Sequence, residues 1–253
     1  MIGIYFSGTG NTRYCVETFM KKYEDNSVTY SIEDGNIERH ILKSQEIVFG
    51  YPVQYSQIPK YVQDFIDNHA NLWKGKYIFV IATMGLFSGD GAGLLARRLK
   101  RHGAIIIGGL HLKMPDSIGD EKALKRSLEV NKELVVTATH KIEQAVTDFK
   151  KGQPSQVGLG LFYHLAGLFG QRLYFYNKTK KYNDQLKVDA SKCIGCGKCI
   201  ELCPMKNIDL NAGTAISHHQ CTMCYRCVNN CPTMALTVLG KNVIEQSCIE
   251  KYL

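Results

Sequence analysis

The 253-residue sequence lacks a long hydrophobic run and has no basic flank before its first apolar residues. Its longest stretch without Asp, Glu, Lys or Arg is 152–171, and the apolar part of that stretch, 157–170, has only 14 residues. Because a bilayer-spanning helix needs about 20 apolar residues, we expect no membrane span. Because no signal peptide precedes the first apolar run, we expect a cytoplasmic protein.

The sequence also lacks an excess of one charge in either terminal part. Residues 1–150 contain 19 Lys or Arg and 17 Asp or Glu, and residues 193–253 contain 5 and 4. The segment 151–192 contains 7 and 2, so it supplies 7 − 2 = 5 of the net charge of +8. We interpret it as a solvated linker, with a docking patch for an acidic protein or an anionic cofactor as the alternative. No common nucleic-acid motif is present, so we expect no nucleic-acid partner.

Short apolar runs alternate with segments of helical composition through residues 1–150. The runs 2–6, 28–32, 47–53, 77–84 and 104–112 predict strands, and 11–22, 60–69, 91–102 and 120–150 predict helices. This alternation predicts an α/β fold with a doubly wound parallel sheet of order 2-1-3-4-5. Such sheets bind ligands at the carboxyl ends of the strands where the winding reverses, which directs attention to the loops at 7–12 and 50–58.

The connecting region 151–185 keeps apolar residues at near-helical spacing, at Val157, Leu161, Leu165 and Leu168. This spacing predicts a helix buried between two domains. A lid over a bound cofactor and a helix lying on a membrane surface are the alternatives.

A glycine-rich loop follows the first predicted strand and opens the first predicted helix. Its residues are Ser7, Gly8, Thr9, Gly10, Asn11 and Thr12. Backbone N–H groups in such a turn, together with the positive end of a helix, bind an anion without a lysine. Arg13 stands where the dinucleotide fingerprint has a glycine, and the Gly-Lys-Ser/Thr of a Walker loop is absent. The pattern therefore favours a terminal monophosphate.

The stretch IYFSGTGNT resembles the FMN-phosphate signature of flavodoxins. The resemblance implies that FMN binds through the loop at 7–12 and through two further loops. In the loop GYPVQYSQIP the implied contacts are Tyr51, Pro52, Val53, Gln54 and Tyr55, with either tyrosine stacking on the flavin. In the loop TMGLFSGDGAG the implied contacts are Thr83, Met84, Gly85, Phe87 and Gly89, with Phe87 as a candidate stacking partner.

Eight of the ten cysteines lie in two repeats, CIGCGKCIELCP (193–204) and CTMCYRCVNNCP (221–232). In the spacing C-x2-C-x2-C-x3-C-P, three thiolates bind one cubane cluster and the fourth binds the other. This predicts one [4Fe-4S] cluster on Cys193, Cys196, Cys199 and Cys231, and a second on Cys221, Cys224, Cys227 and Cys203. The rivals are disulfides, disfavoured in a reducing compartment, and zinc, which needs neither the third cysteine nor the terminal Cys-Pro. Outside the repeats, Cys15 is a predicted core residue and Cys248 has no assigned role.

The second module resembles the bacterial two-cluster ferredoxin domain over about residues 186–240, and the whole chain resembles flavodoxin–ferredoxin fusion proteins of anaerobes. The resemblance implies an FMN-binding domain at 1–150, a linker at 151–185 and a ferredoxin domain at 186–253. It implies electron transfer from a donor protein through two clusters to FMN and on to an acceptor. The alternative is an FMN-dependent reductase of a small organic substrate, with a pocket bordered by His111, Lys113, Asp116 and Ser117.

Overall fold

The computed structural model describes residues 1–86, 89–169 and 185–253. Phe87, a predicted flavin contact, lies outside these ranges, as does much of the predicted linker.

A parallel five-stranded sheet forms the first part of the chain, in the order β2-β1-β3-β4-β5, as predicted. The strands are β1 (Ile2–Tyr5), β2 (Thr29–Ser31), β3 (Glu46–Pro52), β4 (Tyr77–Met84) and β5 (Ile105–Lys113). All of β4 except Tyr77 is buried, which is why this strand reads as a continuous apolar run. Tyr5 is in register with Ser31 on one side and Gly50 on the other, so β1 ends at the point where the winding reverses.

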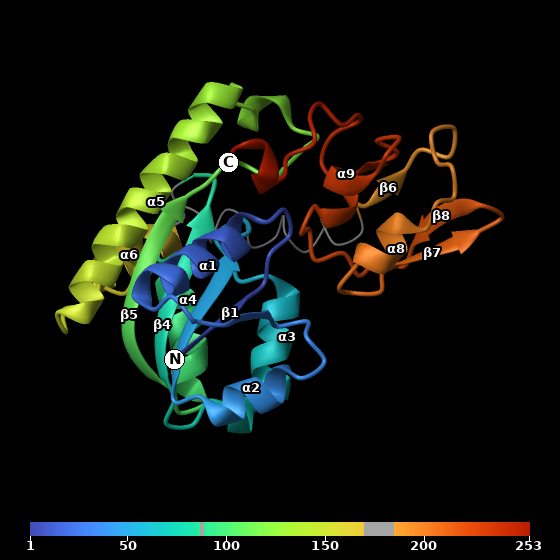
Figure 1. Cartoon of the computed structure of the whole chain (residues 1–253). Coiled ribbons are helices and arrows are strands. Elements are labelled where there is room, and N and C mark those ends of the chain that lie inside the picture. The colour runs from blue at the N-terminus through green and yellow to red at the C-terminus, as the bar shows by residue number, and fades with distance from the viewer. Residues whose placement is uncertain (87–88, 170–184) are drawn as a thin grey trace.

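Helices cover both faces of the sheet (Figure 1). Side chains of α1 (Asn11–Tyr23) and α5 (Leu128–Lys150) pack with those of one face into one core. Side chains of α2 (Ile37–Lys43), α3 (Lys60–Asn68) and α4 (Gly91–Arg101) pack on the other face. This two-sided packing is the doubly wound arrangement that the sequence predicts.

The predicted helix over 120–150 is wrong in its first turns, because α5 begins only at Leu128. The Ser127 hydroxyl accepts a hydrogen bond from the Val130 N–H at 3.3 Å and so caps the helix there. A short 3-10 turn spans Lys122–Leu124. Asp120 is buried and its Oδ2 accepts backbone N–H bonds from Val238, Leu239 and Gly240, at 2.6, 2.9 and 3.1 Å. The segment before α5 therefore serves as an attachment for the C-terminal part of the chain.

The C-terminal part is built from short elements. They are β6 (Lys187–Val188), α8 (Lys198–Leu202), β7 (Ile208–Asn211), β8 (Thr214–Ser217), α9 (Arg226–Asn230) and β9 (Leu236–Thr237). β6 pairs with β9 and β7 with β8, both antiparallel. In Figure 1 these elements, coloured orange to red, lie beside the sheet. The chain then returns to the first part, where the Ile249 N–H donates to the Thr9 carbonyl at 2.9 Å.

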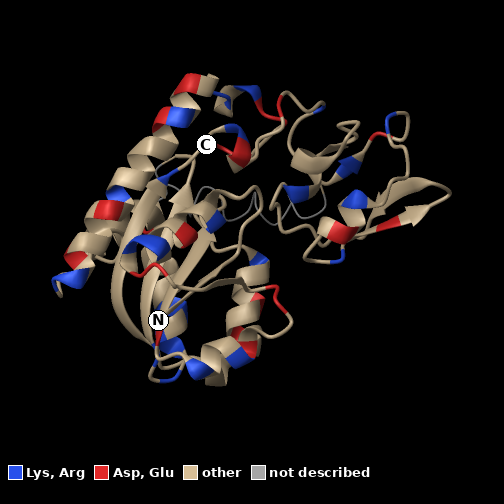
Figure 2. Cartoon of the chain, in the orientation of Figure 1, with Lys and Arg blue, Asp and Glu red and all other residues tan. Residues whose placement is uncertain are grey.

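The linker contains the helix α6 (Leu161–Gly167), as its apolar spacing predicts. The prediction that this helix is buried between two domains is wrong, because Leu161 and Phe162 are 71% and 78% exposed. Its buried residue is Gly167, which packs against Asp90 at the start of α4. No helix in the described ranges has the length and apolar character that crossing a membrane requires. Basic and acidic residues alternate along α5 (Figure 2), in keeping with the near balance of charge in the first 150 residues.

Candidate functional site

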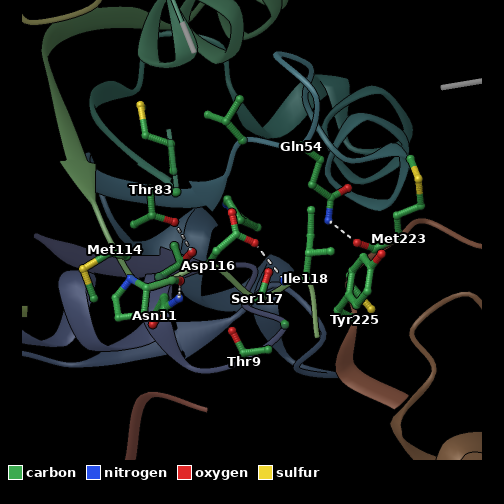
Figure 3. Close-up of a pocket in the computed structure, with 18 of the residues that line it drawn as sticks. Thr9, Asn11, Gln54, Thr83, Met114, Asp116, Ser117, Ile118, Met223 and Tyr225 are labelled. Carbon is green, nitrogen blue, oxygen red and sulfur yellow. Dashed lines mark hydrogen bonds between the residues drawn. The ribbon is translucent and has the colours of Figure 1, made fainter. Parts of the chain in front are cut away.

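A cavity of about 250 Å³ lies where β1, β3, β4 and β5 end. Its described lining comes from four loops of the first part and from one cysteine repeat. The lining residues are Ser7, Gly8, Thr9, Asn11, Thr12, Pro52, Val53, Gln54, Tyr55, Ser56, Thr83, Met84, Gly85, Leu86, Met114, Pro115, Asp116, Ser117, Ile118, Leu124, Met223, Cys224 and Tyr225. Figure 3 shows side chains of both parts of the chain facing this space. The cavity therefore has walls from segments more than 200 residues apart in the sequence.

The glycine-rich loop forms the floor of the cavity and leads into α1. Gly10 adopts the left-handed conformation (φ 89°) just before the helix, and no side chain caps the helix start. The first N–H groups of α1 therefore have no side-chain acceptor of their own, and they suit an anion. Thr12 Oγ1 and Thr83 Oγ1 lie 2.7 Å apart and form a hydrogen bond that ties the loop to the end of β4.

Two buried polar atoms of this loop, Ser7 Oγ and Asn11 Oδ1, have no hydrogen-bond partner among the residues that the structure describes. The Asn11 amide nitrogen already donates to the Pro115 carbonyl at 2.8 Å. The Ser7 hydroxyl can donate to a phosphate oxygen, whereas Asn11 Oδ1 only accepts and so suits a hydroxyl of a sugar-like chain. Because buried polar groups are seldom left unpaired, these atoms fit a ligand that carries both groups, as FMN does.

The second predicted loop turns tightly over residues 54–57. Tyr55 and Ser56 both adopt the left-handed conformation, with φ of 48° and 59°, and backbone bonds of 3.1 and 2.8 Å join Gln54 to Gln57. Such a turn favours Asn-Gly, so holding Tyr-Ser in it costs about 1–2 kcal/mol per residue. Pro52, Val53, Gln54 and Tyr55, the other predicted contacts of this loop, line the cavity. Tyr51 does not: it is fully buried in the core and its hydroxyl donates to the Gly91 carbonyl.

The third predicted loop supplies Thr83, Met84 and Gly85 to the lining, while Gly89 packs against Gly167 of α6. The segment after β5 supplies Asp116 and Ser117, which we expected near a pocket. His111 instead faces α4, where its Nε2 accepts the Ala92 N–H at 2.9 Å, and burial lowers the pKa of His111 to about 4.

Several lining residues are absent from the sequence prediction. They are Ser56, Leu86, Met114, Pro115, Ile118, Leu124, Met223 and Tyr225. Met114 directly continues β5, and the rule that ligands bind at the carboxyl ends of strands could have indicated it. No sequence signal indicates Met223 and Tyr225, because they reach the cavity only through the docking of one half of the chain on the other.

The cysteines of the repeats form two groups of free thiols. Cys193, Cys196, Cys199 and Cys231 line one hollow beside α8. Burial raises the pKa of Cys199, and the other three thiols of the hollow raise it further. Burial likewise raises the pKa of Cys221 to about 12, with Cys224 and Cys203 as its thiol neighbours. Burial also raises the pKa of Cys227, and the nearby Cys224, Cys221 and Cys203 raise it further. The structure thus places Cys193, Cys196, Cys199 and Cys231 around one hollow and Cys203, Cys221, Cys224 and Cys227 near one another. That each set binds a cluster stays a prediction.

Backbone N–H groups already point at four of these sulfurs. The donors are Asn207 to Cys203 and Ala215 to Cys193, both at 3.4 Å, and Met223 to Cys221 and Ala235 to Cys231, both at 3.3 Å. Such N–H···S bonds stabilise thiolates and are a common feature of iron–sulfur sites. Within the described ranges no three His, Cys, Asp or Glu side chains are placed to hold one metal ion. Eight free thiols, four of which accept backbone N–H bonds, are a donor set that suits clusters rather than a single metal ion.

The two repeats achieve the same backbone path with different residues. Gly195 and Gly197 have φ of 65° and 73°, and the corresponding Met223 and Tyr225 have φ of 53° and 59°. The left-handed conformation is costly for residues other than glycine. Met223 and Tyr225 are also the side chains that line the cavity. The second repeat therefore tolerates backbone strain in order to present two large side chains to the first part of the chain.

The second repeat touches the glycine-rich loop directly. A Cβ on Gly8 would lie 2.1 Å from the carbonyl oxygen of Cys224, so only glycine permits this approach. The Gln54 amide donates to the Met223 carbonyl at 3.1 Å and adds a second link. A predicted cluster ligand, Cys224, consequently forms part of the cavity wall.

Arg226 of α9, in the second repeat, bonds to the glycine-rich loop, to the residue Glu33 after β2 and to the end of α8. Its guanidinium donates two hydrogen bonds to the Glu33 carboxylate at 2.8 and 2.7 Å, one to the Ser7 carbonyl at 2.8 Å and one to the Leu202 carbonyl at 3.1 Å. It also lies 5.7 Å from the centre of the Phe6 ring. The Arg226 and Glu33 side chains are only 15% and 24% exposed. Bidentate pairs of this kind are directional, so Arg226 orients the second repeat on the first part.

Each of the two parts of the chain matches the model of a different protein family. Residues 2–101 match the model of the flavodoxin domain, and residues 185–232 match the model of the 4Fe-4S dicluster domain. Ferredoxin-2 of Desulfomicrobium norvegicum is 48% identical over 29 residues, which is 12% of this chain. The chain matches about half of that relative's length (49%).

Solved structures similar to the chain include two flavodoxins. The two-electron reduced Megasphaera elsdenii flavodoxin shares 23% identity over 58% of this chain and 99% of its own, with a TM-score of 0.43. Oxidised Flavodoxin 2 from Bacillus cereus shares 19% identity over 59% and 97%, with a TM-score of 0.45. The family matches confirm the resemblance of both parts: a flavodoxin domain is followed by a 4Fe-4S dicluster domain.

Proposed function

We propose that this chain, in which a flavodoxin domain is followed by a 4Fe-4S dicluster domain, is an electron-transfer flavo-iron–sulfur protein that relays electrons within one molecule. The path runs from a donor protein through two [4Fe-4S] clusters to FMN and then to an acceptor. Bound clusters carry one electron at a time, and bound FMN accepts one or two. The proposed division is 1–150 for the flavin domain, 151–185 for the linker and 186–253 for the ferredoxin domain.

In this proposal the first cluster is bound by Cys193, Cys196, Cys199 and Cys231, and the second by Cys203, Cys221, Cys224 and Cys227. Cys196 is exposed, and its neighbour Ile194 is 65% exposed. A partner protein can therefore approach the first site closely. The second site lies toward the flavin domain, since Cys224 lines the cavity. The order donor, first cluster, second cluster, flavin follows from these positions.

The chain's own residues would hold FMN as follows. The first turn of α1 and the Ser7 hydroxyl bind the phosphate. Asn11 accepts a hydrogen bond from the ribityl chain. Tyr55 and Met84, which line the cavity from two different loops, and Tyr225 of the dicluster domain are the side chains that would pack against the ring. The contact of the Cys224 backbone with Gly8 is the single observation that supports the relay most strongly, because in this proposal Cys224 binds a cluster and Gly8 belongs to the flavin loop.

The alternative, a reductase of a small organic substrate, has less support. Only Asp116 and Ser117 of its four predicted pocket residues line the cavity. The cytoplasmic location stays a prediction that rests on the sequence.

The relay is tested with protein purified and reconstituted without oxygen. We expect roughly eight irons and one FMN per chain. A one-electron donor protein is then mixed with the wild type and with Cys221→Ala, and reduction of the flavin is followed by its visible absorbance. Cys221 is a proposed ligand of the second cluster and does not itself line the cavity, so this substitution interrupts the path without removing a lining side chain.

We expect flavin reduction to slow at least tenfold in Cys221→Ala. Cys248→Ala is the matched control, because Cys248 is a half-buried cysteine outside both repeats, and its rate should equal that of the wild type. A reconstituted protein without FMN would refute the flavin site. Equal rates in Cys221→Ala and the wild type would refute the relay.

A further inference from the structure

The described lining of the cavity contains one carboxyl group, that of Asp116, and the proposed relay gives it no role. Among the described lining residues, Asp116 is the sole Asp, Glu, Lys, Arg or His. Figure 3 shows its carboxyl group in the middle of the lining residues. The other polar side chains of the described lining are those of Ser, Thr, Asn, Gln, Tyr and Cys, and the proposed flavin site assigns no role to a carboxyl group.

The carboxyl group is held in one place. Oδ1 accepts the Ile118 N–H at 2.8 Å. Oδ2 lies close to Gly85 in the loop after β4: a Cβ atom on residue 85 would be only 2.3 Å from it. Because glycine has no Cβ, the carboxyl group can approach this loop. That loop is a predicted flavin contact, and it lies against the same space as Tyr55. Asp116 therefore faces the volume assigned to the flavin ring.

The surroundings of Asp116 favour its protonated form. Burial raises the pKa of Asp116, and the Ile118 N–H, Lys125 and Arg126 lower it by less. Burial lowers the pKa of Lys125, which Glu245 and Asp116 raise in turn. The other titratable groups of the cavity are Tyr55, Tyr225 and Cys224. The described lining thus contains no cation that could neutralise negative charge added to the cavity.

Reduction of a flavin adds negative charge. At neutral pH two electrons and one proton convert oxidised flavin into its reduced anion. In a cavity of low polarity, that charge disfavours a second negative group nearby and raises its pKa. Asp116 is the group placed to respond.

We propose that Asp116 takes up a proton when the flavin in this cavity is reduced and releases it when the flavin is oxidised. The balanced step joins oxidised flavin, the Asp116 carboxylate, two electrons and two protons into the reduced flavin anion and the Asp116 carboxylic acid. One proton binds the flavin ring and the other binds the carboxylate. The electrons come from the clusters, so this inference rests on the proposed function.

The test is the pH dependence of the flavin midpoint potential in the cofactor-loaded protein. The potential is measured with redox mediators between about pH 5.5 and about pH 9, a range that includes raised carboxyl pKa values. One proton per two electrons changes the equilibrium constant tenfold per pH unit, which is about 30 mV, and two protons change it a hundredfold, about 59 mV. For the wild type, we expect the plot of midpoint potential against pH to include a steep part with the two-proton slope.

We expect Asp116→Asn to follow the one-proton slope throughout, and Asp116→Glu to retain a steep segment. Glu245→Gln is the control, because Glu245 interacts with Lys125 but does not line the cavity, and its slope should equal that of the wild type. A one-proton slope throughout in the wild type would overturn the proposal without any variant. So would a steep segment that persists in Asp116→Asn. Mediators supply the electrons, so neither outcome depends on the relay, and missing FMN would instead count against the proposed function.

Discussion

The orientation of the dicluster domain on the flavin domain should depend on Arg226. Its guanidinium makes four hydrogen bonds, two of them to the carboxylate of Glu33. Arg226→Gln removes the charge and leaves Glu33 without its partner. Breaking a buried ion pair costs about 3–5 kcal/mol, and both side chains here are partly exposed, which reduces this. We therefore expect a loss of about 2–3 kcal/mol.

A loss of this size corresponds to a fall of roughly 5–10 °C in the midpoint of thermal unfolding for a chain of this length. Because Arg226 also bonds the Ser7 carbonyl, flavin reduction through the clusters should slow together with the loss of stability. A double-mutant cycle with Glu33→Gln isolates the pair, and we expect a coupling energy of about 1–2 kcal/mol.

The matched control is Arg98→Gln, since Arg98 forms a similar fork on Asp67 at the surface between α3 and α4, away from the cavity. This variant should lose stability while its flavin reduction keeps the wild-type rate. The reasoning is refuted if Arg226→Gln retains both the unfolding midpoint and the electron-transfer rate of the wild type.

Two further outcomes follow from the structure. The folded state holds His111 neutral, with its pKa lowered to about 4 by burial, so the unfolded state binds more protons below pH about 6.5 and stability falls as the pH falls. Between about pH 7.5 and 5.5 the wild type should lose about 1.3 kcal/mol that His111→Gln does not lose, and parallel profiles of unfolding midpoint against pH would contradict this. Gly8→Ala places a Cβ 2.1 Å from the Cys224 carbonyl oxygen, and such overpacking costs about 1–3 kcal/mol. FMN titration followed by flavin fluorescence should therefore show binding weakened by roughly 5- to 100-fold, whereas Gly35→Ala, with no atom near its Cβ, should bind as the wild type does.

Much of the fold could be predicted because its signals are local. The order of strands follows from alternating apolar runs, and the phosphate loop from a strand, two glycines and a helix start. The two groups of cysteines follow from spacing alone. The exception within the sheet domain is the segment before α5, which has helical composition but is not helical at Asp120. There the carboxyl group accepts three backbone N–H bonds from the C-terminal part of the chain.

The composition of the cavity could be predicted only in part. Tyr51 and Tyr55 look equivalent in the sequence, but strand alternation directs Tyr51 into the core while a left-handed turn directs Tyr55 into the cavity. Met223 and Tyr225 replace the glycines of the first repeat. These two side chains reach the cavity because parts of the chain far apart in the sequence pack together. Such long-range contacts leave no periodic pattern in the sequence, so they could not be predicted.

The exposure of the apolar face of α6 also could not be predicted from the sequence. Its apolar spacing is typical of a buried helix, but spacing shows only that one face is apolar and not that something covers it. In the structure Leu161 and Phe162 of this helix are exposed.

The most direct test of the relay is the dependence of flavin reduction on protein concentration. The clusters of the loaded protein are reduced rapidly with a one-electron photoreductant, and the transfer of electrons to the flavin is followed at several dilutions. Because Cys224 lies in the wall of the flavin cavity, we expect a first-order rate constant that does not change across a tenfold dilution. A rate that falls in proportion to protein concentration would show transfer between molecules and would contradict the account.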